Sequence, residues 1–116
     1  MKAFHYYKKS ADDYDDDVSS FRMGWMYENG VGIQKGDIHT AIEYYKKSSK
    51  FNNLESLIRL SSIYELGKGV EKDLDKALYY CWRASKGDED YKNHYRMLWE
   101  QKKIQENSQN LNTFQN

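Results

Sequence analysis

The side chains that could support catalysis or metal binding are few in this sequence, and their spacing follows no ligand or catalytic pattern. His5, His39 and His94 lie far apart and share no metal-ligand spacing. Cys81 is the only cysteine, and it could act as a nucleophile only if the fold placed a histidine beside it. Such a Cys–His pair stays open on residue types alone, although nothing else in the sequence favours it. We expect no catalytic residue, no bound metal and no cofactor, and thus no enzyme.

Two short segments resemble ligand loops but fail the detailed tests. The glycines of 30–36 do not have the dinucleotide-binding spacing, and segment 67–69 lacks the Gly-Lys-Ser/Thr ending of a phosphate loop. The aspartates of 12–17 are not followed by the glycine and the glutamate that a calcium loop needs at its sixth and twelfth positions. We interpret the glycines as helix ends and the aspartates as a solvated loop that caps the next helix, with weak cation binding as a remote alternative.

The composition excludes several classes of function. Lys and Arg total 18, Asp and Glu also total 18, and the formal net charge is zero. We therefore expect no nucleic-acid partner and no anionic membrane surface. No apolar run is long enough to cross a membrane, the N-terminus lacks the apolar core of a signal peptide, and a single cysteine suits a reducing compartment. These features together predict a cytoplasmic protein.

Internal repetition is the strongest signal in the chain. Segment 3–11 returns at 41–49 and again at 77–85, and segment 23–33 returns at 60–70. Each unit has the pattern of two helices, the first ending at a glycine and the second beginning after an aspartate such as Asp73. Two helices cannot bury their apolar faces alone, so successive units should stack. The sequence therefore predicts an all-α protein built as an α/α solenoid of about two and a half helix-pair repeats.

The helical periodicity also predicts where the elements lie. We expect helices at about 1–11, 17–29, 38–50, 53–66, 74–86 and 89–105. They would form one domain over residues 1–106: half repeat 1–11, repeats 17–50 and 53–86, and capping helix 89–105. The Asn- and Gln-rich segment 107–116 is expected to be a disordered polar tail.

The repeated residues resemble the Sel-one-like repeat (SLR), a relative of the tetratricopeptide repeat (TPR). The resemblance implies a right-handed α/α superhelix whose usual role is that of an adaptor or scaffold for protein complexes. Ser61 departs from the pattern, because Gly24 supplies the smallest residue at this place in the first copy, and we expect the second copy to pack slightly more loosely. The residues that carry the resemblance are Gly24, Tyr27, Gly30, Gly32, Ala41, Tyr44, Tyr64, Gly67, Gly69, Ala77 and Tyr80.

One polar stripe is the candidate binding site. Arg22, Trp25 and Asn29 share one side of their helix, and the TPR-like resemblance implies that the first helices line the concave groove. Arg59 and Ser62 would continue this stripe, which we call the first-helix stripe. Trp and Arg are the residues most enriched at interface hot spots. The alternative is that Trp25 packs on the preceding helix.

Basic side chains also recur at equivalent places in the second helices, and we interpret them as a solvated ridge. They are Lys8, Lys9, Lys46, Lys47 and Arg83.

These observations predict a protein-binding module, an adaptor or scaffold whose concave face holds a peptide or a partner surface. The alternative is a dedicated inhibitor or immunity protein that blocks a partner enzyme or toxin. Because the chain opens with half a unit, the apolar side of helix 1–11, with Phe4 and Tyr7, could instead drive a homodimer, or the chain could be a fragment of a longer solenoid.

Overall fold

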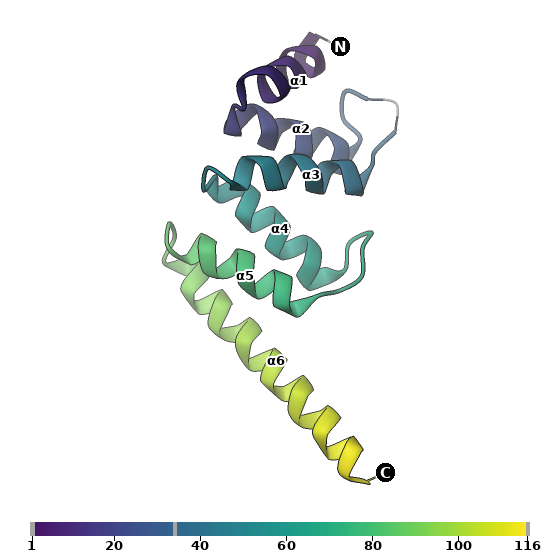
Figure 1. The fold of residues 1–116 in the computed structure, drawn as a ribbon, viewed down its shortest axis with the longest axis vertical. Helices are drawn as coiled ribbons and strands as arrows, with labels where there is room; N and C mark the ends of the chain where they lie inside the picture. Colours follow the sequence, from purple (N-terminus) through teal and green to yellow (C-terminus); the bar gives the residue numbers. More distant parts are fainter. Residues whose placement is uncertain (1, 34, 116) are drawn as a thin grey trace.

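The structure is a computed structural model that describes residues 2–33 and 35–115, with side chains from 3 to 33 and from 35 to 111. Over these residues it contains α-helices joined by short loops and no strand, which confirms the predicted all-α repeat fold. The helices follow one another in chain order from the N-terminal to the C-terminal end of the stack (Figure 1). Their bounds are α1 (Lys2–Tyr14), α2 (Asp17–Asn29), α3 (Ile38–Ser49), α4 (Leu54–Leu66), α5 (Leu74–Ser85) and α6 (Asp90–Gln115).

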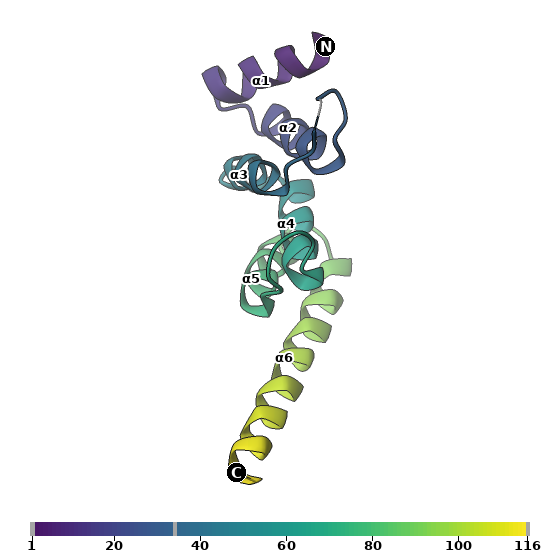
Figure 2. The same ribbon diagram turned by 90° about the vertical axis from the view of Figure 1, so that its right-hand side faces the viewer.

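The helices form an elongated stack rather than a ball. Each helix packs mainly on its neighbours in the chain, and the molecule measures 59 × 30 × 19 Å. Helices α1, α3 and α5 lie along one side, while α2, α4 and the start of α6 lie along the other (Figure 2). The far half of α6 projects beyond α5. Because most contacts join successive elements, the surface is continuous along the stack, as expected of a solenoid.

Equivalent aromatic contacts hold the two helices of each repeat together. Tyr27 of α2 stacks on Tyr44 of α3, with ring centroids 5.9 Å apart and an angle of 11° between the rings. Tyr64 of α4 stacks in the same way on Tyr80 of α5, at 6.2 Å and 8°. The alanine three residues before the second ring, Ala41 or Ala77, is fully buried, so the helices approach closely there. The repeat seen in the sequence is thus a repeat of contacts.

Glycine and aspartate set the ends of the helices as the sequence predicts. Gly30 and Gly67 end α2 and α4 in the left-handed conformation, with φ of 67° and 68°, and their N–H groups donate to carbonyls of the preceding turn. Asp37 and Asp73 stand before α3 and α5, and their side chains accept hydrogen bonds from free N–H groups of the first turn. These caps fix the length of each helix and hence the spacing of the units.

The crossing between the two helices of a unit differs in chemistry between the repeats. In the first repeat, Gly24 of α2 lies against the ring of the fully buried Tyr45 of α3. In the second, the corresponding residues are Ser61 and Cys81, and both are buried. The Ser61 hydroxyl donates to the Ala77 carbonyl oxygen at 3.0 Å. The larger Ser61 is thus matched by a smaller partner, Cys81, and the expectation of a slightly looser second repeat stays a prediction.

Helix α1 packs its apolar side on α2. Phe4 and Tyr7 are half-buried against a cluster formed by Ala11, Met23 and Met26. The side of α1 that was expected to be open is therefore turned toward α2, and the exposed tyrosine rings of α1 are Tyr6 and Tyr14.

The C-terminal helix is longer than the sequence predicts. It continues to Gln115 rather than ending near 105, so the expectation of a disordered tail is not met over residues 107–115. The chain has no proline, and no glycine follows Gly87, so no residue stops the helix. Asn, Gln and Ser lower helix stability only modestly, and Lys102 pairs with Glu106 one turn ahead at 3.8 Å.

Candidate functional site

The residues of the first-helix stripe form two separate groups, one on α2 and one on α4. Arg22 and Asn29 are exposed on α2, and the Asn29 amide donates to the Trp25 carbonyl at 2.9 Å. Trp25 is half-buried, and its ring packs against the cluster between α1 and α2. Arg59 and Ser62 are half-buried on α4. No hydrogen bond or ion pair between described side chains joins the two groups. Because the Trp25 ring packs on the α1–α2 cluster, it contributes to the helix interface as well as to the surface.

A recurring glutamate beside this stripe connects one repeat to the next. The side chain of Glu28 is 2% exposed, and it accepts hydrogen bonds from the Tyr45 hydroxyl at 2.6 Å and from Lys68 at 2.7 Å. Burial raises the pKa of Glu28, but these two hydrogen bonds and the nearby charges of Lys68 and Arg59 outweigh it, so the pKa is lowered. Glu65, at the equivalent position, lies 3.1 Å from the ring nitrogen Nε2 of His94 on α6.

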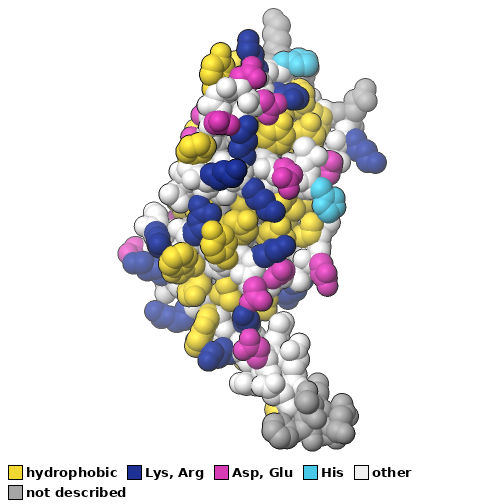
Figure 3. Space-filling model, viewed as in Figure 1, with side chains coloured by type: hydrophobic (Ala, Val, Ile, Leu, Met, Phe, Trp, Pro, Cys, Tyr) yellow, Lys and Arg dark blue, Asp and Glu magenta, His cyan; other side chains and the backbone are white. Residues whose placement is uncertain are grey.

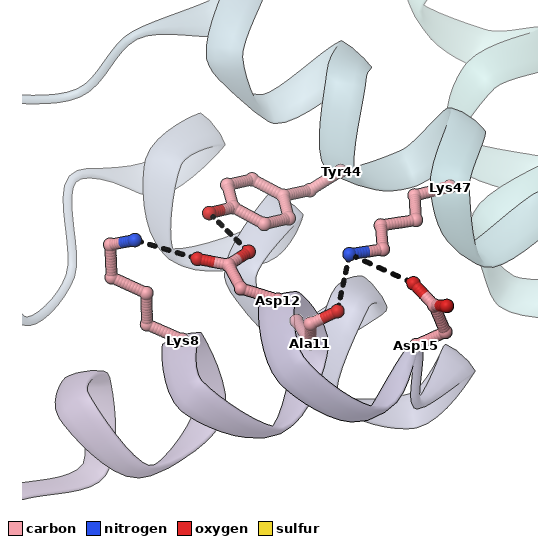
Figure 4. A network of polar contacts seen from close by, with 6 residues as sticks. All are labelled: Lys8, Ala11, Asp12, Asp15, Tyr44 and Lys47. Carbon is pink, nitrogen blue, oxygen red and sulfur yellow. Dashed lines mark hydrogen bonds and ion pairs between the residues drawn. The ribbon is translucent and has the colours of Figure 1, made fainter.

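The basic residues of the second helices connect successive units rather than forming only a solvated ridge. Lys47 of α3 donates to the Ala11 carbonyl near the end of α1 and pairs with Asp15 at 3.3 Å (Figure 4). Beside it the Tyr44 hydroxyl donates to Asp12 at 3.2 Å. A cation at this point satisfies a C-terminal carbonyl and complements the helix dipole.

The next unit repeats this contact with a different cation. Arg83 of α5 donates to the Ser49 carbonyl at the end of α3 and to the Asn52 side chain at 3.0 Å. Lys47 and Arg83 occupy equivalent positions of the repeat, as do Ala11 and Ser49. Lys47 and Arg83 therefore have a structural role. The recurrence of a cation at this position was the feature of the sequence that could have indicated this role.

A group of exposed rings on α5 and α6 is the most distinctive surface feature. Tyr79, Trp82 and Trp99 are 52%, 45% and 45% exposed. Lys86 lies over the Trp82 ring at 4.0 Å from its centroid, and Lys103 lies over the Trp99 ring at 4.5 Å. Hydrophobic side chains with Lys and Arg beside them are visible around α5 in Figure 3. We call Tyr79, Trp82, Tyr95 and Trp99 the aromatic patch.

The aromatic patch borders two hollows in the surface. One, of about 420 Å³, lies between α5 and α6, and the other, of about 490 Å³, lies between α5 and the start of α4. Tyr79 and Trp82 line both hollows, so they form a ridge between them. The residues that line the first hollow are Asp75, Leu78, Tyr79, Trp82, Tyr95, Trp99, Lys102, Lys103 and Glu106.

Sequence reasoning missed this patch, although a signal for it exists. Tyr79, Trp82 and Lys86 follow one another at helical spacing on the side of α5 away from the buried Ala77 and Cys81. None of the five residues of the first-helix stripe lines either of these two hollows.

No hydrogen bond joins the Cys81 thiol to a histidine among the described residues. The Cys81 thiol is buried and points to the Tyr91 carbonyl oxygen at 3.7 Å, while His94 faces Glu65. Burial raises the pKa of Cys81 to about 11, so the thiol is protonated at neutral pH. Over the same described part of the chain, no group of three or more His, Cys, Asp or Glu side chains could hold a metal ion. No described helix is both long enough and apolar enough to span a membrane.

Comparison with known proteins gives a consistent result. The model of the Sel1 repeat matches residues 1–15, 18–50 and 54–88. A sel1-like repeat-containing protein of Acanthamoeba polyphaga mimivirus is 40% identical over 63 residues, which is 54% of this chain and 12% of that protein.

Solved structures of bacterial proteins have the same fold. The crystal structure of a Sel1 repeat protein from Oxalobacter formigenes matches with a TM-score of 0.70 and 33% identity, over 78% of this chain and 36% of that one. A protective antigen of uropathogenic Escherichia coli that displays an SLR fold matches with a TM-score of 0.70 and 24% identity, over 82% of this chain and 20% of that one. The chain thus spans well under half the length of each of these relatives.

Proposed function

This chain belongs to the Sel1 repeat family, whose members generally serve as protein-interaction modules, and we propose that it acts as an adaptor or scaffold that binds a partner protein on its helical surface. The Sel1 repeat is typically an interaction fold rather than a catalytic one. The stacked units provide an elongated, continuous surface held by caps and inter-unit hydrogen bonds. Such a preorganised surface binds with little loss of conformational entropy.

The exposure of three large rings on neighbouring helices is the observation that carries this proposal. Trp and Tyr dominate binding hot spots because each buries a large amphipathic area at low entropic cost. Tyr79, Trp82 and Trp99 remain about half exposed beside hollows that a partner's side chains could fill. We therefore place the main contact at the aromatic patch.

The first-helix stripe is the second candidate surface. Arg22 and Asn29 are exposed and available for polar contacts, and Trp25 keeps part of its ring at the surface. Arg59 and Ser62 are half-buried, so they would contribute at the edge of such a contact.

The test is an affinity capture from the native host with three matched baits, identified by mass spectrometry. They are the wild type, the double variant Trp82→Ala with Trp99→Ala, and the double variant Arg22→Glu with Trp25→Ala. Equal circular dichroism and melting temperature must first show that all three are folded. We expect a partner that the wild type and the stripe variant retain and the patch variant loses. Failure of the wild type to retain any specific partner would contradict the proposed function.

A further inference from the structure

The repeat does not require aromatic rings at the positions of Tyr79 and Trp82. The residues of the first repeat that correspond to Tyr79 and Trp82 are Glu43 and Lys46, 36 positions earlier in each case. The same helix positions therefore carry charged side chains in the first repeat. An aromatic residue that the repeat does not need, and that stays half exposed, has its explanation outside the fold.

The electrostatics of the patch give the sign of the partner's charge. Lys102 is already engaged, because it pairs with Asp75 on α5 and with Glu106 on its own helix. Lys86 and Lys103 form no ion pair with any described residue, and each lies over a tryptophan ring. Lys103 thus borders the hollow between α5 and α6, and Lys86 borders the adjoining hollow on the other side of Trp82. Neither charge is matched by an ion pair with a described residue.

We propose that the groove between α5 and α6 binds an acidic segment of the partner protein that also carries apolar anchor residues. The proposal rests on the proposed function and specifies the partner's chemistry at that site. An apolar anchor enters the hollow beside Trp82 and Trp99, where it removes both ring faces from water. Carboxylates on either side of the anchor meet Lys86 and Lys103.

A polypeptide fits these groups better than a single-stranded nucleic acid does. Rings and lysines together also suit stacked bases. The same hollow, however, is lined by the carboxylates of Asp75 and Glu106, which repel phosphates. The chain as a whole has zero formal net charge, so no wider field attracts a polyanion. A peptide can place its carboxylates only where the cations lie.

Titration of the whole chain with designed probes tests this proposal. The first probe is a short synthetic peptide with glutamates around two leucines, and the second has lysines in place of the glutamates. A third has glutamines there, and the last is oligo-dT. Binding is followed by tryptophan fluorescence and calorimetry. We expect the acidic peptide to bind about tenfold or more tightly than its lysine counterpart, and to weaken as salt rises.

Matched variants locate the site. Lys86→Glu with Lys103→Glu should remove the preference for the acidic peptide, whereas Lys9→Glu with Lys35→Glu changes the net charge equally and should leave the preference intact. Trp82→Ala with Trp99→Ala should weaken both acidic and neutral peptides. All four lysines are exposed, so the charge variants should fold.

The outcomes separate this inference from the broader function. Equal binding of the acidic and lysine peptides, binding of the acidic peptide unaffected by the Lys86 and Lys103 changes, or tighter binding of oligo-dT would overturn it. If host capture still yields a partner that depends on the aromatic patch, the interaction function stands and only the acidic chemistry fails. If capture also yields nothing, both fail.

Discussion

Replacing Gly24 with alanine should destabilise the protein, although alanine is the better helix former. A Cβ atom at position 24 would lie 2.5 and 2.6 Å from two ring carbons of Tyr45. Ordinary carbon contacts are about 3.5–4.0 Å, so the ring would have to shift by about 1 Å. Tyr45 has no room for this shift, because it is fully buried, its hydroxyl is bonded to Glu28, and its ring lies 5.8 Å from that of Phe21.

The expected change in the free energy of unfolding is the sum of two opposing contributions. Overpacking of a dense core costs about 1–3 kcal/mol, and replacing glycine in a helix recovers about 0.5–1 kcal/mol. The expected net loss for Gly24→Ala is therefore about 1–2 kcal/mol, which corresponds to a fall of roughly 4–8 °C in Tm for a domain of this size. Urea unfolding followed by circular dichroism measures this difference directly.

The second repeat provides the control, because it uses Ser61 with Cys81 at the same crossing. Cys81→Tyr should destabilise the chain, and adding Ser61→Gly should recover part of the loss, since the pair then matches Gly24 and Tyr45. If Gly24→Ala were as stable as the wild type, or if Ser61→Gly did not help the Cys81→Tyr variant, the matched-size reasoning would be refuted.

Three further changes test the stack, the buried carboxylate and the caps. Ala77→Asp buries an unpaired charge between α4 and α5 and should abolish the cooperative melting transition seen by circular dichroism; a native-like melt would contradict the packing described here. The lowered pKa of Glu28 means that its carboxylate stabilises the fold above the unfolded-state pKa of about 4.3, and this contribution is lost as the pH falls through the folded-state pKa. Glu28→Gln should therefore lose less stability than the wild type in urea unfolding between about pH 5 and pH 3, and an unchanged pH dependence would exclude the proposed role. Asp73→Ala removes the N-cap of α5 and should cost about 1 kcal/mol in the same assay; the equivalent change at the exposed Asp13, which caps no helix, should cost little.

The fold could be predicted because each repeat contains the residues that end its helices and the residues that pack between them. Glycine and aspartate mark the helix ends, and the recurring Tyr and Ala mark the faces that meet. The stacked pairs Tyr27–Tyr44 and Tyr64–Tyr80 follow from that recurrence. The hydrogen bonds between successive units could not be predicted. Lys47 and Arg83 recur in the sequence, but the carbonyl groups that accept from them belong to the preceding unit, and only the packing of the helices shows which carbonyls these are.

The candidate site was less predictable for a related reason. Trp25 was singled out as a hot-spot residue type on the first-helix stripe, and its counterpart in the second repeat is the small Ser62. Its ring nevertheless packs partly against the α1–α2 cluster. The same comparison applied to the second helices would have identified Tyr79 and Trp82. The contribution of Trp99 could not be predicted in this way, because α6 lies outside the repeated motif and its position depends on the packing of the last unit.

Site-specific photo-cross-linking tests the central claim most directly. A photoreactive amino acid is placed at Lys103, beside the aromatic patch, and in a second protein at Lys35, in the loop between α2 and α3. Both proteins are irradiated in the native host. We expect a cross-linked partner protein from position 103 that is absent from position 35 and is lost when Trp82 is replaced with alanine. Cross-links of equal yield from both positions, or a position-103 product that is indifferent to Trp82, would contradict it.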